Sequence, residues 1–304
     1  MVSNTPWAPH GRARQCSRLI WVLCAAWSVA GAVHAADRHV LWEVRGAHHS
    51  LWLLGSIHML TAAQAELPPV AMDALQRSSR LLMELDPLSI GPQSAGPETR
   101  SLTHLLPGQT LQSLIGARRQ ARLQHYAQTL GIDPAYLAEV QPWFAATTLD
   151  AVYLTRLGFD PNLGVDVQMA RRARADGKPI LELESVAEQY GFFARLPFTE
   201  QNRYLDTTLR ELPESRREAL AAVRAWQAGD LRALESELRH SQRDSPALRD
   251  ILIGARNRRW LPRIETLLDD DEGDCLVVVG ALHLVGQEGL VSLLRAHGRR
   301  VEQR

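Results

Sequence analysis

Two hydrophobic patterns alternate along this chain of 304 residues. Short aliphatic runs bounded by glycine, proline or polar residues predict buried strands at residues 51–54, 80–86, 178–185 and 275–280. Apolar residues at helical spacing predict helices at about 101–160 and 192–270. The order of these elements predicts an α/β (α+β) fold, in which a central mixed β-sheet has a large helical insertion between its two halves.

A β-hairpin is predicted near residue 40. Residues 40–44 and 51–54 have the composition of strands, and a polar connection joins them. His48 and His49 lie in this connection, and neighbouring side chains on a strand point to opposite faces. We therefore interpret both as solvated turn residues rather than metal ligands. A last short strand is expected at 299–302.

The first 35 residues have the features of an export signal. Three arginines precede an apolar run over residues 19–33, and the small residue Ala35 completes a cleavage motif. We expect cleavage after Ala35, which leaves residues 36–304 as a single domain in the periplasm or outside the cell. The apolar run is shorter than the roughly 20 residues of a membrane span. No membrane span is therefore expected after cleavage, and a retained anchor is the alternative.

Charge and cysteine content exclude some functions. The chain has 34 basic and 34 acidic side chains, and removal of the arginine-containing signal would leave a slightly acidic protein. Such a balance argues against nonspecific binding of nucleic acid. Cys275 is the one cysteine beyond residue 35, so an intrachain disulfide is not expected in the exported domain. The sequence does not define an oligomeric state.

One motif, Gly-x-x-His after an apolar run, occurs twice. Gly55 leads to His58, and Gly280 leads to His283. Each histidine would lie beyond the carboxyl end of a strand, which is where open α/β sheets bind ligands. Imidazole can bind a metal there or transfer a proton near neutral pH. The alternative is that both histidines are hydrogen-bonded turn residues.

Three acidic residues are candidates for the same site. Glu84 interrupts an apolar run, and burial of its carboxylate would cost free energy without a cation or a donor. It could instead face outward on its strand. Glu184 ends a strand, but it could also favour the start of the next helix through the helix dipole. Asp166 is placed to cap a helix over 167–176, and a role in the site is the alternative.

Arg256 and Asn257 directly follow an apolar segment. An inward arginine would offer a fixed cation to a carboxylate or to an oxyanion. The arginines at 256, 258 and 259 could equally form a surface patch.

Taken together, these motifs resemble those of the TraB/GumN family, which is related to the Tiki proteins. The resemblance rests on Leu54-Gly55-Ser56-Ile57-His58, Leu82-Met83-Glu84-Leu85-Asp86, Gly164-Val165-Asp166, Gly177-Lys178-Pro179-Ile180 with Leu183-Glu184-Ser185, Arg256-Asn257 and Gly280-Ala281-Leu282-His283. It spans nearly all of the chain beyond residue 35, in the expected order.

The resemblance implies roles for individual residues. His58, His283 and Glu84 would bind a divalent metal ion such as Zn, Mn or Co, and Glu84 could act as a general base. Arg256 would stabilise developing negative charge, so these four residues are the expected catalytic set. Glu184, Asn257 and Asp166 are expected to bind substrate. A metal ion lowers the pKa of bound water toward ~7, and a carboxylate can then accept its proton.

The expected function is an exported metal-dependent hydrolase that acts on a peptide or protein. A non-catalytic protein that sequesters a peptide or signal in the same cleft is one alternative. A metal-independent, esterase-like hydrolase with a histidine as general base is another. We expect His58, Glu84 and His283 to meet at the carboxyl edge of the sheet.

Overall fold

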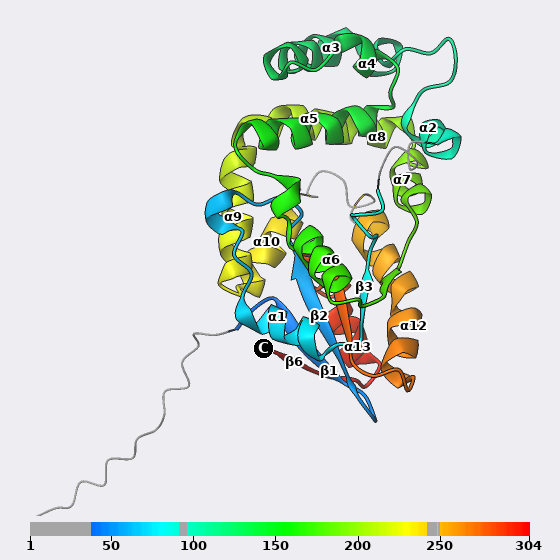
Figure 1. The fold of residues 1–304 in the computed structure, drawn as a ribbon. Helices are drawn as coiled ribbons and strands as arrows, with labels where there is room; N and C mark the ends of the chain where they lie inside the picture. Colours follow the sequence, from blue (N-terminus) through cyan, green and yellow to red (C-terminus); the bar gives the residue numbers. More distant parts are fainter. Residues whose placement is uncertain (1–37, 91–95, 242–247, 249) are drawn as a thin grey trace, which may run out of the picture. The chain divides into compact units, whose positions relative to one another are not determined.

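A computed structural model describes residues 38–90, 96–241, 248 and 250–304 of the chain (Figure 1). The expected signal peptide, residues 1–35, lies outside the described residues. None of the helices in the described part combines the length and apolar character needed to cross a bilayer.

A mixed sheet of six strands lies at the centre of the fold. Its order is β4-β3-β5-β2-β1-β6. The strands are β1 (Leu41–Arg45), β2 (Ser50–Ser56), β3 (Arg80–Met83), β4 (Ile180–Glu182), β5 (Cys275–Gly280) and β6 (Arg300–Gln303). The four strands from β4 to β2 are parallel, whereas β1 is antiparallel to both β2 and β6. The expected mixed sheet and α/β class are therefore confirmed.

Strands β2 and β5 pair in parallel, with Gly55 opposite Val279 and Ser56 opposite Gly280. Both strands are almost completely buried, as expected for predominantly apolar strands inside a parallel region of a sheet. Parallel strands end at the same edge of a sheet, so the two Gly-x-x-His motifs leave the sheet side by side.

One set of helices packs around the sheet and shares its hydrophobic core. These are α1 (Pro69–Arg77), α6 (Val165–Ala175), α9 (Ser215–Gln227), α10 (Leu231–Ser241), α12 (Ala255–Asp269) and α13 (Leu290–Ala296). A π-helical turn, Asp250–Gly254, leads directly into α12. Short 3-10 turns lie at Ala62–Gln64, Pro161–Leu163, Leu212–Glu214 and Ala281–His283.

A second hydrophobic core lies within the helical insertion. It is built mainly from α3 (Leu111–Leu130), α5 (Pro142–Arg156) and α8 (Phe198–Glu211), and Figure 1 shows α5 and α8 side by side. Thr110 caps α3, and Gly131 ends it in the left-handed conformation that favours glycine. Helices α2 (Pro97–Thr103), α4 (Pro134–Ala138) and α7 (Val186–Ala194) complete the insertion.

The structure differs from the sequence-based expectation at four places. Strand β3 ends at Met83, so Glu84 follows the strand instead of lying within it. Strand β4 covers three residues, and Glu184 follows it. Helix α6 begins at Val165 with Gly164 as its N-cap, so the prediction that Asp166 caps it is wrong. His49 is not solvated, because its side chain is 7% exposed and its ring bonds the carbonyl of Leu267.

Candidate functional site

The candidate residues gather where the parallel strands end. His58 follows β2, Glu84 follows β3 and His283 follows β5. Atoms of all three lie within 3.6 Å of one point, the position that a Cβ would take at Gly280: Oε1 of Glu84 at 3.3 Å, and Nε2 of His58 and Cδ2 of His283 at 3.6 Å each. Glycine at this position keeps the space between the three side chains free of a methyl group.

His58 is the exposed member of the group, with 63% of its side chain open to solvent. Its Nδ1 lies 2.9 Å from Oδ2 of Asp166, and because a carboxylate only accepts, Nδ1 is the donor. The charge of Asp166 and its hydrogen bond with the ring raise the pKa of His58 to about 9. The ring is therefore protonated at pH 7, and its Nε2–H faces the space beside Gly280.

The position of Asp166 explains this contact. The backbone N–H of Val165 donates to the carbonyl of Ile57 at 3.0 Å, which fixes the start of α6 beside the end of β2. A Cβ on Gly164 would lie 2.3 Å from the carbonyl oxygen of His58, so only glycine fits there. Asp166 therefore holds His58 and does not cap its helix, and its contact with substrate stays a prediction.

His283 is buried, with 5% of its side chain exposed. Asn257 donates through Nδ2 to the carbonyls of His283 and Glu288, so its Oδ1 accepts from Nδ1 of His283 at 2.7 Å. This fixes the tautomer, and Nε2 of the ring accepts from Nη1 of Arg256 at 3.2 Å. Burial lowers the pKa of His283 to about 3, so the ring is neutral at pH 7.

Glu84 lies between cations and a backbone donor. The N–H of Gly280 donates to Oε1 at 2.6 Å, and Nη2 of Arg256 donates to Oε2 at 2.6 Å. Burial raises the pKa of Glu84, but the positive charges of His283, Arg256 and His58 outweigh it and lower the pKa to about 2. Because His283 is neutral at pH 7, Arg256 is the main cation facing Glu84 there.

Glu184 holds Arg256 in place. Its side chain is fully buried and accepts from Nε and Nη2 of Arg256, from Nη2 of Arg259 at 2.7 Å and from Nε1 of Trp260 at 3.0 Å. The alternative role at the start of α7 belongs to Ser185, which caps that helix together with Glu188. Glu184 is thus a buried anchor with no free edge for substrate.

All five N–H donors of Arg256 are used within the protein. Nε faces Glu184, Nη2 faces Glu184 and Glu84, and Nη1 donates to the carbonyl of Leu252 and to His283. The inward alternative for Arg256 is therefore the observed one, and Asn257 is completely buried. In this arrangement Arg256 has no donor left for an oxyanion and serves to orient Glu84 and His283.

Three participants were not identified as such from the sequence. The sequence marks Gly280 only as the glycine that precedes His283, whereas in the structure its N–H donates to Glu84. Arg259 and Trp260 both donate hydrogen bonds to Glu184. Trp260 also contacts the ring of His283, at 4.5 Å between centroids. Their spacing from Arg256, three and four residues along α12, places all three on one helix face and could have indicated a shared partner.

The arrangement of donor atoms at the site does not match a metal centre. Among the described residues, no group of three His, Cys, Asp or Glu side chains is positioned to hold one. The physical reason is Arg256, whose guanidinium hydrogen-bonds both Nε2 of His283 and Oε2 of Glu84. The three expected ligands, as arranged, do not fit an ion bound by all of them.

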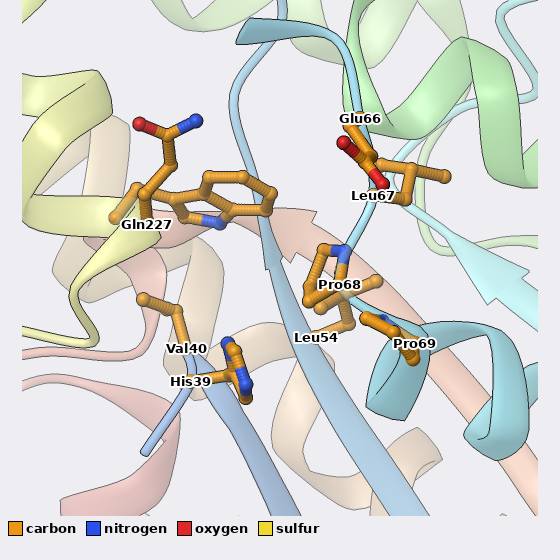
Figure 2. Close-up of a pocket in the computed structure, with 9 residues that line it drawn as sticks. His39, Val40, Leu54, Glu66, Leu67, Pro68, Pro69 and Gln227 are labelled. Carbon is orange, nitrogen blue, oxygen red and sulfur yellow. The ribbon is translucent and has the colours of Figure 1, made fainter. Parts of the chain in front are cut away.

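Two cavities differ in their position relative to the candidate site. One, of about 230 Å³, is lined largely by apolar residues, with Gln227 and Glu66 on opposite sides of it (Figure 2). It contains none of the candidate site residues. The other, of about 330 Å³, is lined by Ile57 and Leu282, which immediately precede the two motif histidines.

Comparison with known proteins agrees with the motifs. The sequence profile of the TraB/PrgY/gumN family matches residues 40–303, which confirms the family resemblance. The uncharacterized protein YbaP of Escherichia coli (strain K12) is 26% identical over 269 residues, covering 84% of this chain and 97% of the relative. An uncharacterized protein of Treponema pallidum (strain Nichols) is 22% identical over 294 residues, covering 91% and 87%. No solved structure gives a significant match.

Proposed function

This chain belongs to the TraB/PrgY/gumN family, and we propose that it is an exported hydrolase of peptides whose reacting groups are His58 and Glu84. The observation that carries this proposal is the approach of Nε2 of His58 and Oε1 of Glu84 to the same point beside Gly280, within 3.6 Å. One group is a cation with a proton to give, and the other is an anion that accepts hydrogen bonds.

The two side chains suit complementary steps of amide hydrolysis. Glu84 accepts a hydrogen bond from the attacking water and receives its proton as the oxygen bonds to the carbonyl carbon. His58 donates its Nε2 proton to the leaving nitrogen as the carbon–nitrogen bond breaks, and the proton on Glu84 then returns through solvent to His58. Positioned acids and bases contribute about 10²–10⁴-fold to a rate when their pKa values lie near the working pH, so this step requires bound substrate to raise the pKa of Glu84 from about 2.

The surrounding residues support this pair without touching substrate. Arg256 and the N–H of Gly280 hold the two oxygens of Glu84, and Asp166 holds His58. Glu184 fixes Arg256 in turn. Such preorganisation places charges before the reaction begins, which is an effective way to stabilise a transition state.

A metal-dependent reaction is the second candidate, and it follows from the family resemblance alone. It requires Arg256 to release Nε2 of His283, so that His283 and Glu84 become free as ligands. A bound divalent ion would supply an acidic water at neutral pH.

A digest of a peptide library, read by mass spectrometry, tests the proposal. The purified chain should release products in the presence of EDTA, and His58→Gln and Glu84→Gln should each release them at least 100-fold more slowly. Products that appear only after loading with Zn²⁺, Mn²⁺ or Co²⁺ would favour the metal-dependent reaction, and metal content of wild type and His283→Ala would then identify the ligands. Binding of peptides without any product would contradict hydrolysis and favour sequestration.

A further inference from the structure

The cavity of about 330 Å³ next to the motif histidines has no part in the chemistry described so far. Four helices of the chain, α5, α8, α9 and α10, contribute to its wall, and Ile57 and Leu282 close it toward the site. Its volume lies in the range of about 300–1,000 Å³ that is usual for small-molecule sites. Ile57 and Leu282 immediately precede His58 and His283 in the sequence, so a group bound there would contact the residue next to each histidine.

The charged residues that line this cavity all have the same sign. They are the carboxylates Asp150, Glu211, Glu218 and Glu237. Glu211 pairs with Arg210 at 3.4 Å and Glu218 with Arg217 at 3.9 Å, whereas Asp150 and Glu237 have no arginine or lysine of the described residues within 4.0 Å. A cavity lined by one sign of charge attracts and concentrates ligands of the opposite sign.

Asp150 lines the cavity and has no cationic partner among the described residues. It is partly buried on α5, and its carboxylate accepts from Oγ of Ser215 at 3.4 Å, with no arginine or lysine of the described residues within ion-pair distance. Burial raises the pKa of Asp150. A carboxylate removed from water gains free energy when a cation approaches it.

Tyr204 provides a second polar group in the wall of the cavity. It lines the same cavity beside Asp150, and its hydroxyl makes no hydrogen bond within the described part of the chain. Burial raises the pKa of Tyr204, so the hydroxyl keeps its proton and can accept a hydrogen bond from an incoming N–H donor.

The remaining wall is apolar. It is formed by Ile57, Ala219, Ala222, Leu234 and Leu282. An aliphatic stem packs against such a wall while its charged end reaches a polar partner, as lysine and arginine side chains do on protein surfaces.

We propose that this cavity is the subsite for a lysine or arginine side chain of the peptide substrate. The proposal rests on the proposed hydrolase, since it assigns the substrate class of the same site. The stem would lie against Ile57 and Leu282, and the cation would reach Asp150 and Glu237.

Binding tests the subsite independently of cleavage. The probes are three blocked tripeptides, acetyl-Ala-X-Ala-amide, in which X is lysine, arginine or norleucine. Titration calorimetry with the full chain should show that lysine and arginine peptides bind at least 10-fold more tightly than the norleucine peptide. The preference should fall to less than 3-fold in Asp150→Asn and in Glu237→Gln. Glu214→Gln is the matched control, because Glu214 lies outside the cavity and is 55% exposed.

Measurement in His58→Gln separates the two proposals. That variant should keep the preference for lysine and arginine while it loses cleavage, so a chain that never cleaves can still confirm the subsite. Equal binding of the three peptides, no binding of any of them, or an unchanged preference in folded Glu237→Gln would overturn the subsite.

Discussion

Replacement of Glu184 by glutamine should destabilise the protein strongly. The substitution keeps the shape of the side chain but removes the negative charge that faces Arg256 and Arg259. Loss of one partner from a buried ion pair leaves an uncompensated charge and costs about 3–5 kcal/mol. Because Glu84 still faces Arg256 and the amide retains some hydrogen bonds, we expect the lower end, ~3 kcal/mol.

Urea unfolding followed by circular dichroism measures this loss. The control is Glu188→Gln, since Glu188 is 51% exposed and pairs with Arg259 at 3.5 Å. Glutamine can also replace glutamate in the capping box at the start of α7, so the control should change the free energy of unfolding by less than about 1 kcal/mol. A loss below about 1 kcal/mol in Glu184→Gln, with an unchanged denaturant slope, would refute the anchoring role of Glu184.

Three further outcomes follow from the geometry. Asp166→Asn should lower the pKa of His58 from about 9 toward its ordinary value of 6.5, as followed by NMR titration of the ring; an unchanged pKa would show that Asp166 does not hold the proton. Gly280→Ala should fold normally, since its φ of −50° suits alanine, but the methyl group beside Glu84 should lower kcat/KM at least 10-fold. The free energy of unfolding should be greatest near pH 6.5. Above pH 6.5 stability falls, because the folded chain retains a proton on His58 that the unfolded chain releases. Below pH 6.5 stability also falls, because the unfolded chain protonates His283 while the folded chain does not. Below pH 4.5 the same holds for Glu84. His58→Gln should remove the decline between pH 6.5 and about 9 in urea titrations, and equal declines in both proteins would contradict that assignment.

The sheet could be predicted because its strands are local signals. Apolar runs that lead into a glycine mark β2 and β5. Parallel pairing of these strands brings His58 and His283 to one edge of the sheet, independently of how the helices pack. Glu84 and Glu184 come together for the same reason, since backbone pairing continues past β3 and β4. Strand ends and helix starts could not be predicted to the residue, because both depend on a few backbone hydrogen bonds.

The pairing of site residues could not be predicted, because it depends on how helices are placed over the sheet. Asp166 meets His58 through the backbone contact of Val165 with Ile57, which no local pattern encodes. Arg256 faces inward because it donates hydrogen bonds to the buried carboxylate of Glu184, which lies 72 residues away in the sequence. The sequence identified which residues carry charge and chemistry, whereas the fold determined which of them touch each other.

A double-mutant cycle on the hydrolysis of one peptide tests the central claim that His58 and Glu84 act on the same substrate molecule. The kcat/KM values of wild type, His58→Gln, Glu84→Gln and the double variant are compared. We predict that each single substitution lowers kcat/KM at least 100-fold and that the double variant is at most ~10-fold worse than either, because residues that act as a unit are not additive. A loss of kcat/KM in the double variant equal to the product of the two single losses would contradict a shared reaction centre. Single variants as active as wild type would contradict it as well.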